Sequence, residues 1–156
     1  MRFAAESAKI AFAFVRRGEI PEALSTWILP RLVGMSRAAE VLYSGRTMPA
    51  HEALAFGIVS RVVPDAELIP AARSLAEDIA RKTAPASVAI TKRLVWHNLT
   101  ETDMARAEEL ENRLFGWTGR QPYAREGVTA FLEKRAPDWK MKPSKDLPDF
   151  VPGRQR

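Results

Sequence analysis

The segment GEIPEALSTWILPRLVG, residues Gly18–Gly34, is the part of the chain around which we predict the fold to be organised. The apolar run Ile10–Val15 leads into it, and a glycine and a proline near its start are typical of a turn. Glu22 follows this turn where a helix would begin, and the second glycine would end that helix. A strand, a turn, an acid and a helix in this order often hold one carboxyl group at the rim of a pocket.

Glu22 has two interpretations. Its carboxylate can simply complement the partial positive charge at the helix N-terminus, and the local pattern alone favours this role. The alternative is an acid that transfers a proton during a reaction, which requires apolar side chains around the carboxyl group. The neighbours that could supply such walls are Phe14, Ala23, Leu24 and Trp27.

The composition is that of an ordinary soluble globular protein with one real core. The chain has 156 residues, of which 46% are hydrophobic and 28% are charged. The formal net charge of +5 is modest and spread along the chain, so we expect no nucleic-acid partner. The same charge fits an anionic small ligand, such as one that carries phosphates.

Several functional classes are excluded or disfavoured by missing residues. Cysteine is absent, which excludes disulfides, thiolate catalysis and cysteine-based metal sites. The two histidines, His51 and His97, lie far apart and in no recognisable metal-ligand spacing, so we expect no metal site. No apolar run is long enough for a bilayer, and early charges interrupt a signal-peptide core. We therefore expect a soluble cytoplasmic protein without a membrane partner.

The pattern predicts an α/β protein in which helices dominate and strands are few. We expect a buried strand at 8–15, a short strand at 47–48 and a third at 58–63. Ser36 and Thr100 are candidate helix caps, and Gly45 and Gly57 are candidate helix ends. The expected helices are 37–44, 49–56, 66–83, 85–97, 100–117 and 123–134. A buried strand needs partners on its edges, so we expect part of the sheet to lie outside this polypeptide. Recurrent prolines after Ala136 indicate an extended, unpacked tail.

Four spaced segments carry a resemblance to a known family. They are Gly18–Gly34, SRAAEVLYSGR at 36–46, AHEALAFGIVSRVVP at 50–64 and REGVTAFLEKR at 125–135. In this order they resemble the crotonase superfamily, the enoyl-CoA hydratase/isomerase group, over roughly residues 3–140. Several motifs in the right order are far more specific than any one of them.

The resemblance implies a spiral of ββα turns followed by a helical trimerisation region. It divides the chain into a partial spiral core at 1–64, a helical region for oligomerisation and CoA contact at 65–135, and a flexible tail at 136–156. The family stabilises the enolate of a CoA thioester with two backbone N–H groups, an oxyanion hole. The chain corresponds only to the second half of the family pattern, and both hydratase glutamates are absent. Where the second of them is expected, the chain has Ala13-Phe14.

The resemblance also assigns candidate site residues. Glu22 falls where some isomerases and a dehalogenase of the family place a catalytic aspartate, which makes it the candidate acid or base. Phe115, Phe131 and Lys134 correspond to contacts with the adenine end of CoA, often made to a neighbouring subunit. Four cations lie near Phe131 in the sequence, and for them a solvated surface is the alternative to binding an anionic ligand: Lys134, Arg135, Lys140 and Lys142.

Two functions follow from this resemblance. The first is an N-terminally truncated hydratase or isomerase whose substrate is an acyl-CoA and which needs no other cofactor. The second is a non-catalytic oligomerisation or CoA-binding remnant of that family. In either case we expect a homo-oligomer, a trimer or hexamer, or assembly with full-length relatives.

Overall fold

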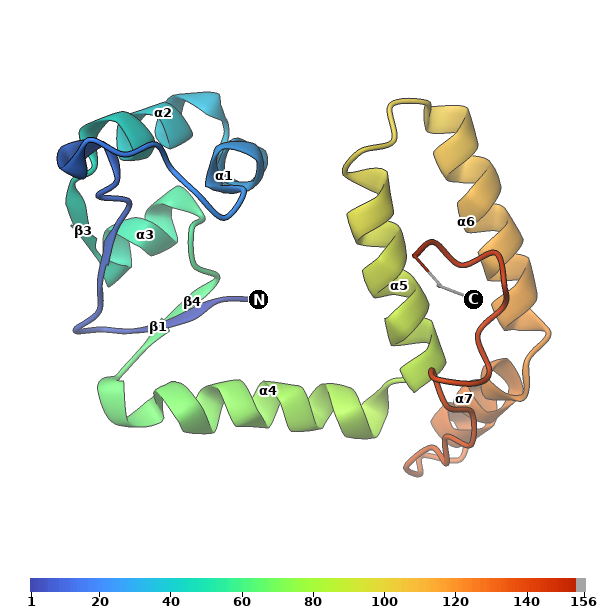
Figure 1. The fold of residues 1–156 in the computed structure, drawn as a ribbon. Coiled ribbons are helices and arrows are strands. Elements are labelled where there is room, and N and C mark those ends of the chain that lie inside the picture. The colour runs from blue at the N-terminus through green and yellow to red at the C-terminus, as the bar shows by residue number, and fades with distance from the viewer. Residues whose placement is uncertain (154–156) are drawn as a thin grey trace. The chain divides into compact units, whose positions relative to one another are not determined.

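The structure, a computed structural model, describes residues 1–153 as two compact units. The first unit is Met1–Leu75 and the second begins at Ala76. The helix α4 (Leu68–Lys82) carries the chain from one unit to the next (Figure 1). Each unit has a hydrophobic core of its own. None of the helices in the described part of the chain is long and apolar enough to cross a membrane.

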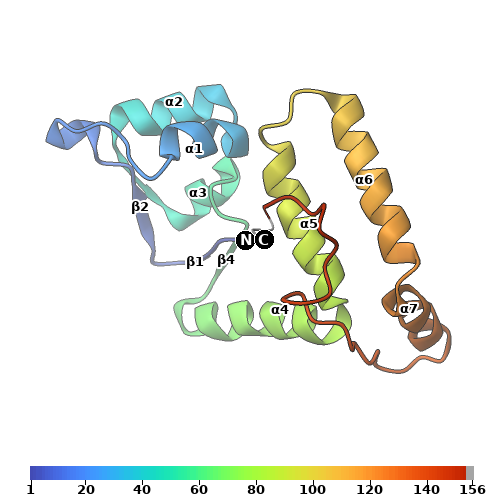
Figure 2. The same ribbon diagram turned by 45° about the vertical axis from the view of Figure 1, so that its right-hand side comes forward.

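The first unit packs short strands against three helices (Figure 2). Its elements are β1 (Phe3–Ala5), β2 (Lys9–Ala11), the 3₁₀ turn η1 (Val15–Arg17), α1 (Ser25–Val33), α2 (Met35–Ser44), β3 (Thr47–Pro49), α3 (Ala50–Phe56), β4 (Arg61–Val63) and the 3₁₀ turn η2 (Asp65–Glu67). β1 pairs in parallel with β4, and β2 pairs antiparallel with β3. The core lies between these strands and helices and includes the fully buried Val41 and Met48.

The predicted buried strand at 8–15 is wrong in length and in burial. Only Lys9–Ala11 is a strand, and its central Ile10 is half-buried between two exposed residues. The run then bends into the 3₁₀ turn, in which the N–H of Arg17 donates to the carbonyl of Phe14 at 2.8 Å. Alanines alternate along the run and offer little side chain to a sheet, so its β propensity is weak.

The predicted strand at 58–63 is also shorter than expected. Residues 58 and 59 close the end of α3, because their N–H groups both donate to the carbonyl of Ala53. Gly57 makes this closure possible by adopting a left-handed conformation with φ of 82°. The cap predicted at Ser36 is replaced by Gly34, which directly precedes α2.

The glycine predicted to end the helix at 37–44 is confirmed. Gly45 is left-handed, with φ of 55°, and donates its N–H to Val41. It also lies close to η1: a Cβ atom on Gly45 would lie 3.1 Å from Cγ of Arg16 and 3.3 Å from Cγ2 of Val15. A side chain at this position is therefore opposed both by backbone conformation and by the packing of α2 against the turn.

We predict that Gly45→Ala destabilises the chain by about 2 kcal/mol or more, because it adds a clash to a left-handed backbone. Gly18→Ala is the matched control, since Gly18 has φ of 77° but no atom within 4 Å of its Cβ position. The control should lose only about 1 kcal/mol, the conformational part. Urea unfolding of the two variants measures the difference, and equal losses would contradict the close approach.

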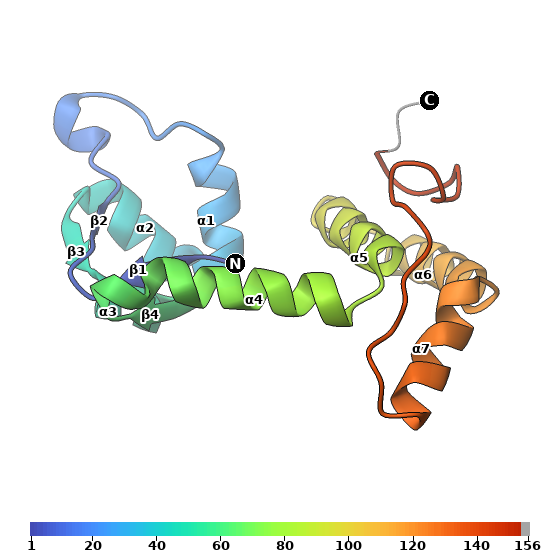
Figure 3. The same cartoon turned by 90° about the horizontal axis from the view of Figure 1, so that it is seen from below.

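The second unit is a set of packed helices. α5 (Pro85–Asn98) packs against α6 (Met104–Gly119), which turns into α7 (Pro122–Leu132) (Figure 3). Its core includes Ile90, Leu114 and Tyr123. The cap predicted at Thr100 is replaced by Asp103, whose carboxylate accepts hydrogen bonds from the N–H groups at 105 and 106.

The expectation of an unpacked tail at 136–156 is wrong for residues 136–153. Leu147 is 5% exposed and Val151 is 3% exposed, and both belong to the core of the second unit. The hydroxyl of Tyr123 donates to the carbonyl of Met141, and Arg93 donates to the carbonyl of Pro152 at 3.0 Å. Between the prolines lie large apolar residues whose side chains pack against the helices. The composition of the segment did not indicate this packing. The last three residues of the expected tail, 154–156, lie outside the described residues.

We predict that Leu147→Ala lowers the free energy of unfolding by about 2–4 kcal/mol, because it leaves a cavity in the core. The control is Met104→Ala, since Met104 is 85% exposed. It should change the stability by less than about 0.5 kcal/mol. Chemical unfolding measures both, and a neutral Leu147→Ala would mean that the segment does not pack in solution.

Candidate functional site

Glu22 lies in the loop before α1 and is exposed. It is not the cap of that helix: the capping position is Leu24, and no side chain there makes a capping hydrogen bond. The loop is held instead through the Glu22 backbone carbonyl, which accepts from Ser25 N at 3.0 Å and Ser25 Oγ at 2.6 Å. The carboxyl group is thus left available to solvent.

The backbone next to Glu22 is strained. Ala23 and Leu24 both have positive φ, of 53° and 58°, a conformation that costs a non-glycine residue about 1–2 kcal/mol. Both side chains are exposed, so these two expected walls do not cover the carboxyl group. Trp27, half-buried, lies instead 4.0 Å from the guanidinium of Arg31. Strain of this kind is common at functional sites, but the sequence carried no signal for it.

The signature residues of the first unit form a structural ion-pair network. The guanidinium of Arg46 binds the carboxylate of Glu40 on α2 at 2.7 Å and that of Glu52 on α3. The hydrogen bonds from Arg46 hold the pKa of Glu52 below its usual value. The network joins α2 to α3 next to the glycine that ends α2. The presence of these residues in the family motifs is therefore explained by the packing of the unit rather than by a role in chemistry.

In the second unit, Phe115 lines a cavity of about 250 Å³. The cavity lies among the start of α5, the end of α6 and the start of α7, and Trp117, Tyr123 and Met141 give it a largely apolar wall. Phe115 itself is 79% exposed. An exposed phenyl ring beside an apolar hollow offers a stacking surface to a planar ligand.

Phe131 and Lys134 do not line this cavity. They lie at the far end of α7, an 11-residue helix about 16 Å long. Phe131 is 81% exposed, and Lys134 is an exposed residue in the left-handed conformation, with φ of 54°. The three predicted ligand contacts therefore belong to one helical unit but not to one pocket.

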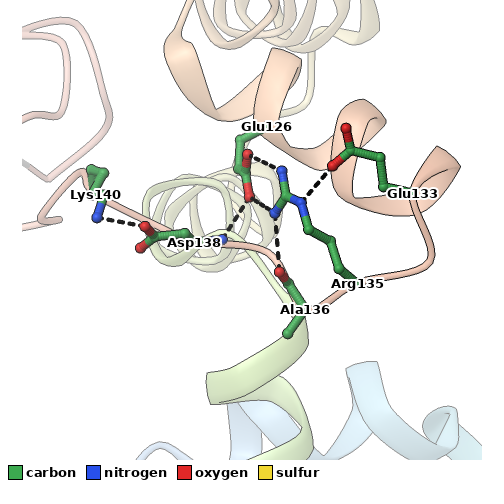
Figure 4. A network of polar contacts seen from close by, with 6 residues as sticks. All are labelled: Glu126, Glu133, Arg135, Ala136, Asp138 and Lys140. Carbon is green, nitrogen blue, oxygen red and sulfur yellow. Dashed lines mark hydrogen bonds and ion pairs between the residues drawn. The ribbon is translucent and has the colours of Figure 1, made fainter.

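Two of the four cations near Phe131, Arg135 and Lys140, are neutralised by a network that the sequence did not reveal (Figure 4). Arg135 donates to both carboxylate oxygens of Glu126, at 2.6 and 2.9 Å, and to Glu133 at 2.6 Å. Lys140 pairs with Asp138 at 2.5 Å. These acids stand two or nine residues from their partners, spacings that local pattern rules do not connect.

The chain offers no evident metal centre in residues 1–153: no group of three or more acids and histidines lies close enough to hold an ion. His51 is exposed on α3. His97 is half-buried and lines an open hollow on α5 with Lys92 and Trp96.

Comparison with known proteins gives the family. A family model described as enoyl-CoA hydratase/isomerase matches residues 1–142. An enoyl-CoA hydratase of Alternaria alternata is 38% identical over 88% of this chain and 46% of its own length. A 1,2-epoxyphenylacetyl-CoA isomerase of Escherichia coli is 36% identical over 87% of this chain and 51% of its own. The chain spans about half the length of the curated relatives it matches.

Solved structures agree in fold. A probable enoyl-CoA hydratase/isomerase of Mycobacterium abscessus superimposes with a TM-score of 0.88 at 37% identity, over 91% of this chain and 57% of that one. An enoyl-CoA hydratase of Bacillus anthracis gives 0.85 at 34% identity, over 91% of this chain and 54% of that one. The chain is a member of the enoyl-CoA hydratase/isomerase family, with the α/β crotonase fold in a helix-rich form. The resemblance seen in the sequence is thereby confirmed.

The Glu126 network predicts a specific pH dependence. The hydrogen bonds from Arg135 and from the N–H of Asp138 lower the pKa of Glu126 from 4.5 to about 2. A lowered folded-state pKa contributes stability that is complete above the unfolded value and is lost as the pH falls from 4.5 towards 2. Stability in that window should therefore depend on this carboxylate.

We predict that Glu126→Gln lowers the melting temperature at pH 6 and that its difference from wild type shrinks between pH 4.5 and 2. Glu109→Gln is the control, because it removes the same charge from an exposed position on α6. Thermal unfolding followed by circular dichroism across this pH range measures the difference. A deficit for Glu126→Gln that stays constant down to pH 2 would contradict the lowered pKa.

Proposed function

We propose that this chain is the C-terminal part of an enzyme that acts on acyl-CoA thioesters through an enolate, as a hydratase or an isomerase. The observation that carries the proposal is the family match over residues 1–142, together with the 0.88 TM-score. The relatives named above are hydratases of enoyl-CoA and an isomerase of an epoxyphenylacetyl-CoA, so CoA thioesters are common to the activities in their names. No metal or separate cofactor is required by this chemistry.

Glu22 is the proposed proton-transferring group. Deprotonation next to a thioester carbonyl develops negative charge on the carbonyl oxygen, and a nearby carboxylate takes or returns the proton on carbon. The strained backbone beside the carboxyl group supports this role, since α1 itself does not require it, although Ala23 and Leu24 do not form the expected apolar walls. The oxyanion donors are expected from the half of the family pattern that this chain does not match.

The helices of the second unit are proposed to contact the adenosine end of CoA and to assemble the oligomer. An aromatic ring can stack on adenine, and an ammonium group can bind a phosphate, which are the parts proposed for Phe115, Phe131 and Lys134. Support comes from their exposure and from the cavity beside Phe115. The exposed apolar side chains Val128, Phe131 and Leu132 on α7 support a trimer or hexamer, or assembly with full-length relatives.

We predict that the purified chain turns over crotonyl-CoA or a 3-enoyl-CoA only at background rates. An oxyanion-hole donor contributes roughly 10²–10³ in rate, and both donors are expected outside this chain. Absorbance of the conjugated thioester measures the reaction. A rate near that of a full-length relative would contradict the proposed division of the active site.

The role of Glu22 is tested in a fusion with the N-terminal half of a relative. Glu22→Gln should lower turnover of the fusion by several orders of magnitude and leave its melting temperature nearly unchanged. Glu19→Gln, an exposed neighbour in the same loop, is the control and should keep the activity. If Glu22→Gln is fully active, Glu22 is not the proton-transferring group. If the fusion assembles and binds CoA but turns over no substrate, the non-catalytic CoA-binding alternative is favoured.

A further inference from the structure

Lys134 holds a conformation that its own sequence does not favour. It is the second residue after α7 and has φ of 54°, a position at which helices ordinarily place glycine. Its N–H donates to Phe131 at 3.2 Å, and the N–H of Arg135 donates to Ala130 at 3.0 Å, which closes the helix end. A lysine stays left-handed only where neighbouring contacts outweigh the strain.

Those contacts come from the next residue along the chain. Arg135 donates to Glu126, to Glu133 and to the carbonyl of Ala136 (Figure 4). Glu126 accepts in addition from the N–H of Asp138 at 2.7 Å. One carboxylate on α7 therefore fixes the chain on the C-terminal side of Lys134 at two points, three residues apart.

The packing that follows this turn supports the same geometry. Trp139 lies over Gly127, where a Cβ atom would be 3.4 Å from its ring, and meets Tyr123 edge to face at 5.1 Å. The chain can reach this position only if it reverses direction directly after α7. Glu126 directly precedes Gly127 on α7, so it lies next to the chain reversal that its carboxylate stabilises.

Lys134 differs from the other cations of the turn. Arg135 and Lys140 are both paired with carboxylates, whereas the Lys134 ammonium has no hydrogen-bond or ion-pair partner in residues 1–153. The turn therefore presents an unneutralised ammonium group at Lys134, three residues along the chain from the exposed ring of Phe131. A free cation and an exposed aromatic ring at the same helix end suit a phosphorylated, aromatic ligand.

We propose that Glu126 is a positioning residue for Lys134: by binding Arg135 and the N–H of Asp138, it fixes the left-handed turn from which the Lys134 ammonium reaches a phosphate of CoA. The inference rests on the proposed function for its ligand, but it assigns Glu126 a part that the family comparison does not. Glu126 does not touch the ligand and acts through the backbone of Lys134.

The test is a double-mutant cycle with coenzyme A as the probe, titrated into the 156-residue chain by calorimetry. Lys134→Ala should weaken binding by about fivefold or more, the effect of losing a charged contact. Glu126→Gln should weaken it by a similar factor, although it removes a negative charge and would otherwise favour a polyanion. The control Glu109→Gln makes the same charge change on α6 and should not weaken binding.

The double variant decides whether Glu126 acts through Lys134. If it does, Glu126→Gln with Lys134→Ala binds no more weakly than Lys134→Ala alone. If the losses of affinity in the two single variants multiply in the double variant, the proposal is overturned. It is also overturned if Glu126→Gln binds coenzyme A as tightly as the wild type.

Hydrogen exchange separates this inference from the proposed function. The N–H groups of Arg135 and Asp138 should exchange at least about tenfold faster in Glu126→Gln than in wild type or Glu109→Gln. Unchanged exchange overturns the positioning role even if CoA binds. Absence of CoA binding by the wild type, with faster exchange in Glu126→Gln, refutes the proposed ligand and with it the positioning, and leaves Glu126 as a structural clamp.

Discussion

The carboxylate of Glu126 accepts hydrogen bonds from two later positions of the chain, the guanidinium of Arg135 and the N–H of Asp138. Charge-assisted bonds of this kind are stronger than neutral ones, and here they close a turn that has no glycine. The direction of the chain after α7 depends on them. Once that direction is set, the segment at 139–151 can place its apolar side chains on the helices and complete the core of the second unit.

The first unit is organised differently. Its two sheets have two strands of three residues each, which is less than a sheet normally needs to be stable by itself. Its order comes from helices: left-handed glycines end α2 and α3, and Arg46 ties the two helices through Glu40 and Glu52. The strands are short and are held in place mainly by helices. This arrangement agrees with the match of the chain to about half the length of its relatives.

The glycines that end helices and the family were predictable from the sequence, whereas the N-terminal caps of α2 and α6 and the side-chain partnerships were not. Gly45 and Gly57 marked their helix ends because few other residues adopt positive φ, and the spaced motifs identified the family. The strand predicted at 8–15 was too long because its alanine-rich run has no strong preference, and the strand predicted at 58–63 was too long because Ile58 and Val59 close the end of α3. The segment after Ala136 was mistaken for an unpacked tail because proline content hides the burial of Leu147 and Val151. The clamp at Glu126 joins residues nine and twelve apart, beyond any local rule.

Recognition of the adenosine end of a CoA thioester by the second unit is the proposal on which the other functional assignments rest. Its most direct test is amide chemical-shift mapping of the 156-residue chain with two fragments of CoA, adenosine 3′,5′-bisphosphate and pantetheine. The account predicts that the nucleotide shifts the amide signals of Phe115, Phe131 and Lys134 in a saturable way and that pantetheine leaves them unchanged. Saturable shifts with pantetheine alone, or nucleotide shifts confined to other helices, would contradict it.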